Sequence, residues 1–137
     1  MEVTENTQIP IENPILRKAM YKCYGAKCFY TGQLVEFEDM HIDHIIPKSK
    51  GGKDCIDNYV FTCSRINLAK NNKTDKHFIE RITLINKLLF VNSVVIEYNN
   101  LLLNNKIMEG KFPVDDFCKE NRVSLSDKNK IIRELNK

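Results

Sequence analysis

The stretch 40–70 limits the possible fold and chemistry of this chain most, because it places metal-binding and proton-accepting side chains around a glycine turn. These side chains are Asp43, His44, Asn58 and Asn67. The turn between them contains Gly51-Gly52. One carboxylate, one imidazole and two amides at this spacing can hold a divalent cation beside a general base. The stretch therefore predicts a small metal-dependent catalytic site.

The local pattern predicts a hairpin followed by a helix. Residues 40–46 and 59–63 have the apolar character of two short strands, and the loop 48–57 joins them. Ser64 can cap a helix that carries Asn67 in its first turn. An ideal strand would direct Asp43 and His44 to opposite faces, so we expect a twist or bulge near Pro47 to re-aim them.

This arrangement resembles the HNH endonucleases, whose core is a ββα-metal finger. The residues that match are Asp43-His44-Ile45-Ile46-Pro47, the glycine pair, Asn58, and the run from Ser64 to Lys70. Asn67 replaces the final histidine, as in the HNH domain of RNA-guided CRISPR effectors. The resemblance covers about a third of the chain, or about half when Cys28–Gly32 is included.

The resemblance implies a role for each matching residue. Asp43 and Asn67 match the metal ligands, and their oxygen atoms suit Mg²⁺ or Mn²⁺. His44 matches the general base, which is neutral and receptive near pH 7. We expect an oxygen of Asn58, from either the side chain or the main chain, to accept a hydrogen bond from Nδ1–H of His44.

The basic residues around the motif are candidates for contacts with DNA phosphates. The three strongest candidates are Lys48, Arg65 and Lys70. The formal net charge of the whole chain is only +3, so the local basic cluster is more informative than the total. Taken alone, such a cluster is more often a solvated face, but its position beside the predicted metal site favours nucleic acid as the partner.

The cysteines do not match the zinc knuckle of many HNH proteins. Such a knuckle uses two Cys-x-x-Cys pairs to supply four ligands. Here Thr31 follows Cys28 at the position of the second cysteine, and Ile66 follows Cys63 in the same way. We therefore expect no structural zinc, and we expect these thiols to pack as small apolar groups.

The overall pattern predicts an α+β fold, with the HNH core flanked by an N-terminal helix and a helical C-terminal half. We expect a flexible arm over 1–12, a nuclease core over 13–75, and a helical extension over 76–137. Asn13-Pro14 is a good start for the first helix, and Gly25 marks its end. The segment 34–37 alternates and could form a further strand.

The C-terminal half shows helical periodicity. Its apolar stripe comprises Phe78, Ile82, Ile85 and Leu89. The register becomes unclear at 91–93, so one long helix could kink or divide there, and we expect a break at Asn104-Asn105. Short amphipathic pieces follow at 114–120 and 126–135. This extension is expected to pack on the core or to form a homodimer or a complex with a partner protein, and a helix-turn-helix DNA reader is a less favoured alternative.

The start of the chain and its five cysteines indicate an intracellular protein. Residues 1–6 are acidic and polar, without the apolar segment of a secretory signal. The cysteine count is odd, which favours free thiols in the cytoplasm of a cell or a phage-infected host. No apolar run approaches the length of a membrane-spanning helix.

The function that fits best is a metal-dependent HNH endonuclease that hydrolyses DNA phosphodiester bonds. Two alternatives stay open at this point. The first is a catalytically idle ββα module that binds nucleic acid or a partner protein, and the second is a structural zinc module. The intact set of catalytic residue types disfavours the first, and the missing cysteines disfavour the second.

Overall fold

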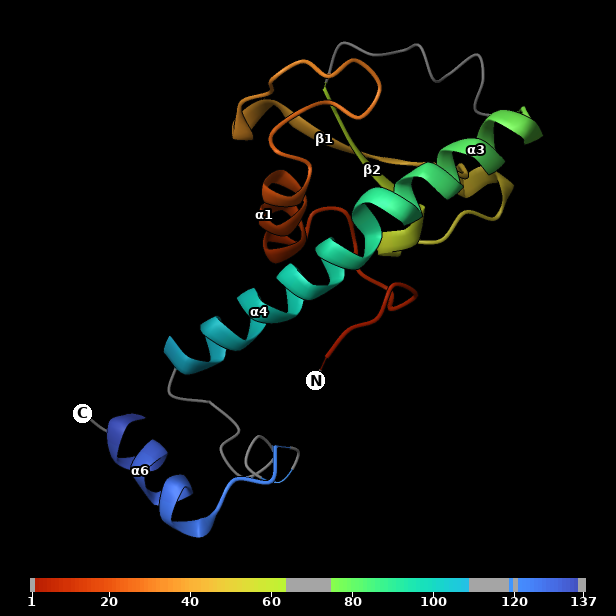
Figure 1. Ribbon diagram of the computed structural model, residues 1–137. Helices are drawn as coiled ribbons and strands as arrows, with labels where there is room; N and C mark the ends of the chain where they lie inside the picture. Colours follow the sequence, from red (N-terminus) through yellow and green to blue (C-terminus); the bar gives the residue numbers. More distant parts are fainter. Residues whose placement is uncertain (1, 64–74, 109–118, 120, 136–137) are drawn as a thin grey trace. The chain divides into compact units, whose positions relative to one another are not determined.

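The computed structural model describes residues 2–63, 75–108, 119 and 121–135. The chain divides into two compact units, residues 1–99 and 100–137, which are described separately below. The first unit contains the hairpin and most of the helices (Figure 1). Its combination of helices with an antiparallel sheet is the α+β architecture that the sequence predicts.

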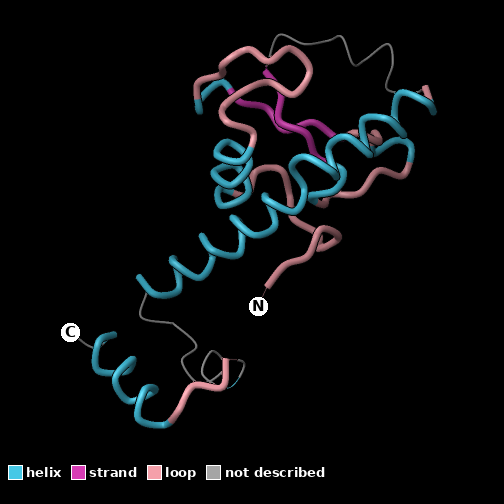
Figure 2. The backbone as a smooth tube through the Cα atoms, viewed as in Figure 1, coloured by secondary structure: helices cyan, strands magenta, loops and turns pink. Residues whose placement is uncertain are grey.

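Two antiparallel strands form the sheet, and their bounds agree well with the sequence pattern (Figure 2). Strand β1 (Met40–His44) pairs with β2 (Tyr59–Cys63), with Met40 opposite Cys63 and His44 opposite Tyr59. The pairing is regular along the whole of β1, so the predicted bulge does not occur within the paired strand. The predicted third element, a helix from Ser64, lies outside the described residues.

Helix α1 (Pro14–Cys23) begins where the sequence predicts. The side chain of Asn13 accepts hydrogen bonds from two backbone N–H groups of the first turn, and proline occupies the first helical position. One face of the helix is buried through Leu16, Ala19 and Met20. The segment 34–37, in contrast, is not a strand: it forms a single bridge between Lys27 and Leu34, followed by the short 3₁₀ turn η1 (Phe37–Asp39).

A long helical segment crosses the first unit and contains a π-helical turn. Helix α3 (Lys76–Asn86) is followed by the π turn η4 (Lys87–Val91) and then by α4 (Asn92–Met108). Asn86 and Val91 are both almost fully buried although they are five residues apart. A π turn accommodates one more residue than an α turn, so it brings both positions to the same face. This turn explains why the helical register becomes unclear near 91.

The N-terminal segment is tied to the core, whereas the sequence predicts a flexible arm. The side chain of Asn99 accepts a hydrogen bond from Val3 N and donates one to Val3 O. Ile9 is 3% exposed, and its carbonyl accepts a hydrogen bond from the Tyr59 hydroxyl at 2.6 Å. The polar composition of residues 1–12 does not reveal these contacts, because the partner residues lie up to 96 residues away along the chain.

The second unit contains the end of α4 and helix α6 (Leu125–Leu135). The Ser124 hydroxyl accepts a hydrogen bond from Asp127 N and caps α6. Helix α4 continues to Met108, so the break predicted at Asn104-Asn105 is wrong. The amphipathic piece predicted over 114–120 lies almost wholly outside the described residues. None of the described helices has the length and apolar character needed to cross a membrane.

Candidate active site

The Asp-His pair stands at the end of the paired part of β1. His44 is the last residue of the strand, and Asp43 precedes it opposite Val60. Both residues are half-buried, in contrast to His41, which is exposed on the same strand. The two side chains therefore lie at the end of the strand, shortly before the loop 48–57, which we call the glycine loop.

The glycine loop folds back onto Ile46, two residues after the end of β1, because Gly52 has no side chain. A Cβ atom at Gly52 would lie 1.7 Å from the carbonyl oxygen of Ile46. Gly51 is needed for a different reason, since its φ of +87° lies in the left-handed region that glycine adopts without strain. The backbone N–H of Gly52 donates a hydrogen bond to Pro47 O, which closes the loop.

Asn58 holds this loop against the strand. Its side-chain oxygen accepts a hydrogen bond from Ile46 N at 2.8 Å, and its amide donates to Ile46 O and Lys53 O. Its main-chain oxygen accepts a hydrogen bond from Ile45 N. Asn58 is 7% exposed, so these bonds satisfy a buried amide. Both oxygens of Asn58 thus bond the backbone after His44, rather than the imidazole ring that we expected them to hold.

The ring of His44 is instead held by Asp54. The Nε2 atom lies 2.7 Å from Oδ1 of Asp54, and the Lys48 ammonium lies 3.0 Å from Oδ2 of the same carboxylate. The ring also contacts Tyr59 edge-on, with 5.3 Å between the ring centroids. Hydrogen bonds from His44 and Lys48 lower the pKa of Asp54 to about 2. Sequence reasoning missed Asp54, although an acidic residue two positions after a glycine turn was an available signal.

Asp43 lies in a different environment from His44. Burial, and then the nearby Asp43 carboxylate, raise the pKa of the Tyr30 phenol to about 12. The Asp43 carboxylate thus acts electrostatically on the Tyr30 phenol. A half-buried carboxylate at a strand end, adjacent in sequence to a histidine, is a suitable oxygen donor for a hard cation such as Mg²⁺.

Cys28 still lies close to Cys63, although the second cysteine of each zinc-binding pair is missing. Burial by itself raises the pKa of the Cys28 thiol, but hydrogen bonds from the Thr31 hydroxyl and from backbone groups of Thr31, Cys63 and Tyr30 bring it below its ordinary value. Cys28 and Cys63 are thus neighbours across the start of the hairpin. Among the described residues, no three His, Cys, Asp or Glu side chains are grouped to hold a metal ion.

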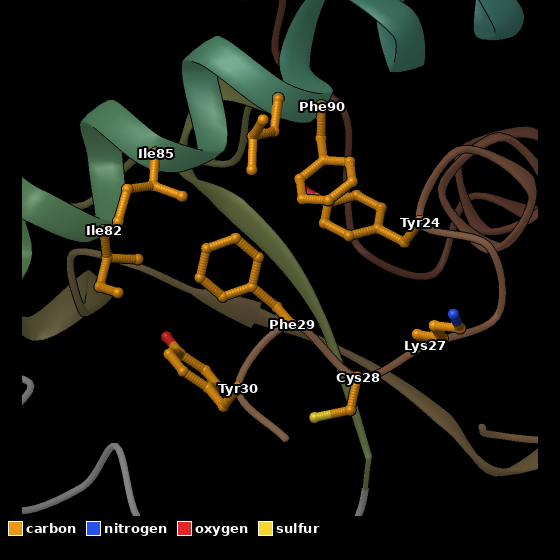
Figure 3. A pocket seen from close by; sticks show the side chains of 9 residues that line it. Tyr24, Lys27, Cys28, Phe29, Tyr30, Ile82, Ile85 and Phe90 are labelled. Atoms are coloured by element: carbon orange, nitrogen blue, oxygen red, sulfur yellow. The ribbon is translucent and has the colours of Figure 1, made fainter. Parts of the chain in front are cut away.

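An apolar groove of about 430 Å³ lies between the segment after α1 and the long helix (Figure 3). Aromatic and aliphatic side chains line most of it, and Phe29 and Tyr30 face Ile82 and Ile85 across it. Ile85 is 43% exposed and Leu89 is 61% exposed. Three residues of the predicted apolar stripe, Ile82, Ile85 and Leu89, therefore line an open groove. The fully buried face of the helix contains Asn86.

Three predicted site residues lie outside the described residues. They are the metal ligand Asn67 and the phosphate-binding residues Arg65 and Lys70. Lys48 is described: its side chain is 64% exposed and shares the Asp54 carboxylate with His44. The structure therefore brings together His44, Asp54 and Lys48. Asp43 precedes His44 on a regularly paired strand, where successive side chains point to opposite faces.

Comparison with protein families agrees with this geometry. Residues 28–83 match the model of a family described as HNH endonuclease. The matched segment includes the hairpin, the glycine loop and the first part of α3. This segment, which is less than half of the chain, is thus similar to the HNH endonuclease family. Searches among curated proteins and among solved structures gave no match.

Proposed function

We propose that this protein is a metal-dependent endonuclease that hydrolyses phosphodiester bonds in DNA, with His44 as the general base. The observation that supports this most is the Asp43-His44 pair at the end of β1, inside a segment similar to the HNH endonuclease family. A second support is the immobilisation of His44 by Asp54, because a base must be held in place to act efficiently.

Asp43 and Asn67 would hold one divalent cation, Mg²⁺ or Mn²⁺, through oxygen atoms. When bound, such a cation stabilises the charge that develops on the phosphate and on the leaving oxygen. His44 accepts the proton of the attacking water, whose oxygen forms the new bond to phosphorus as the bond to the leaving oxygen breaks. The exposed residues Lys48, Lys50 and Lys53 on the loop attract the phosphate backbone, as Arg65 and Lys70 are expected to do.

A plasmid-nicking assay tests this function. Wild-type protein should nick supercoiled DNA with Mg²⁺ or Mn²⁺ and should lose this activity when a chelator is added. His44→Ala should lower the rate by at least about 100-fold, since a general base contributes that much or more. DNA binding, measured by fluorescence anisotropy, should be retained.

His41→Ala is the matched control, because His41 lies on the same strand and is exposed. This variant should nick at close to the wild-type rate. Equal nicking by wild type and His44→Ala would falsify the assignment of the base. DNA binding without any metal-dependent nicking by wild type would favour the catalytically idle module instead.

A further inference from the structure

Asp54 presents its carboxylate to His44 from a backbone that is fixed on several sides. Its own carbonyl accepts a hydrogen bond from Ile9 N at 2.8 Å, and the preceding carbonyl, of Lys53, accepts one from Asn58. The next residue, Cys55, is 4% exposed. The N-terminal segment and the glycine loop therefore position this carboxylate together.

Each oxygen of the carboxylate has its own partner. Oδ1 lies 2.7 Å from Nε2 of His44, and Oδ2 lies 3.0 Å from the Lys48 ammonium. The His44 and Asp54 side chains are only 17% and 18% exposed, so water competes little for this contact. Lys48 balances the negative charge and keeps the carboxylate ionised beside the imidazole.

An ionised carboxylate can only accept hydrogen bonds, so a neutral His44 ring must carry its proton on Nε2. The lone pair then resides on Nδ1, and the edge contact with Tyr59 restrains the plane of the ring. We propose that Asp54 is a positioning residue that fixes the His44 tautomer and leaves Nδ1 as the atom that accepts the proton of water. This inference builds on the proposed nuclease function but concerns the ring itself, so it can be tested without activity.

The direct test is the ¹⁵N NMR spectrum of histidine-labelled protein without metal. At a pH of about 8.5 an ordinary imidazole is neutral, and the ¹⁵N shifts then report which nitrogen carries the proton. The His44 signals are assigned by their loss in His44→Ala. Wild type should show the tautomer with the proton on Nε2, and Asp54→Ala should shift toward the mixture of an unrestrained imidazole.

Asp57→Ala is the matched control for this experiment. Asp57 lies in the same loop and carries the same charge, but it accepts a hydrogen bond from the Cys55 thiol. Its removal should leave the His44 spectrum unchanged. A wild-type ring protonated on Nδ1, or an Asp54→Ala spectrum identical to that of wild type, would overturn the proposal.

The kinetic test separates positioning from binding. Asp54→Ala should lower kcat by about 10-fold to 100-fold with little change in KM, because a misplaced base slows proton transfer without weakening phosphate contacts. A higher KM with unchanged kcat would show that Asp54 acts in DNA binding and would overturn the proposal. If Asp54→Ala does not fold, Asp54→Asn replaces it, because it keeps the volume and removes the charge.

The two tests have separate outcomes. If wild type shows no nicking, the nuclease function fails, but the NMR comparison still decides whether Asp54 sets the His44 tautomer. If nicking depends on His44 while the tautomer is independent of Asp54, the nuclease function stands and the role of Asp54 is rejected.

Discussion

At the scale of single residues, Gly51 and Gly52 are adjacent but are required for different physical reasons. Gly51 adopts a left-handed backbone conformation and has open space around its Cα. Gly52 has no backbone strain of that kind, but its Cα faces the Ile46 carbonyl so closely that a methyl group cannot fit. One position is limited by conformation and the other by volume.

This difference predicts unequal effects of alanine. Gly51→Ala should lower the free energy of unfolding by about 1–2 kcal/mol, the strain of a left-handed residue with a Cβ. Gly52→Ala should cost more than about 3 kcal/mol, because the backbone at Ile46 must move. Urea denaturation of both variants provides the comparison. Equal losses would show that the loop does not close on Ile46 as described.

The Asp54 carboxylate predicts a dependence of stability on pH. Its pKa is about 2 in the folded protein, below the ordinary value of about 3.9, so the folded state favours the ionised form. Its contribution is therefore present above about pH 4 and is lost as the pH falls toward 2. Wild type should be more stable than Asp54→Asn at neutral pH, and the difference in unfolding free energy should shrink over this range. A constant difference between pH 6 and pH 2 would contradict the ion-pair geometry.

The candidate site shows what the sequence could and could not predict. Asp43, His44 and Asn58 were recognisable because their spacing around a glycine pair is characteristic. The partner of the His44 ring was not recognisable, because Asp54 comes within hydrogen-bond distance of the ring only when the loop packs Gly52 against Ile46. The sequence motif shows which residue types are present. The hydrogen bond between Asp54 and His44 depends on how the loop folds back, and the motif does not show this.

At the scale of elements, Asn86 is the polar residue that attaches the long helix to the sheet. It is fully buried, its amide donates to Tyr59 O at 2.8 Å, and its side-chain oxygen accepts a hydrogen bond from the Tyr24 hydroxyl. The strands and α1 were predictable from alternation and capping. The buried face of α3 was not, because its apolar stripe lines an open groove while an asparagine makes the interior contact.

Asn86→Ala should therefore destabilise the protein strongly. The substitution removes the two hydrogen bonds of the Asn86 side chain, to the Tyr24 hydroxyl and to Tyr59 O. These two groups then have only their mutual contact of 3.3 Å, so we expect a loss of about 1–3 kcal/mol. Asn92→Ala, at an exposed position of the adjoining helix, should change stability by less than about 0.5 kcal/mol. Thermal and urea unfolding of both variants measure the difference. Similar stabilities would mean that Asn86 does not hold α3 to β2.

At the scale of the whole molecule, one site with one base predicts single-strand cleavage. A single binding event should cut one strand, so nicked plasmid should appear before linear plasmid. We propose that the lysines of the glycine loop contact phosphates, and phosphates carry no sequence information. Activity should therefore show little sequence preference and should fall steeply with salt as counterion release weakens binding.

A plasmid time course at several salt concentrations, with mapping of the cut positions, tests this expectation. Linear product at one sequence, formed by dilute protein and insensitive to salt, would indicate a base-reading element that the described residues do not reveal. A steep salt dependence of nicking in wild type that becomes shallower in Lys50→Ala would support phosphate contacts by the loop. Lys50 is exposed and suits this test better than Lys48, which is shared with Asp54.

The π turn between α3 and α4 accommodates one residue more than an ordinary α turn. Asn86 before the turn and Val94 and Tyr98 after it are all buried, and the extra residue in η4 sets their relative rotation. Deleting one residue there, such as the exposed Leu88, would convert the π turn into an ordinary α turn and would keep these buried positions on one face. A one-residue deletion in the turn should therefore be tolerated, whereas a deletion within α3 should rotate the residues that follow by about 100°. The helix thus tolerates a change of length at this turn that it does not tolerate elsewhere.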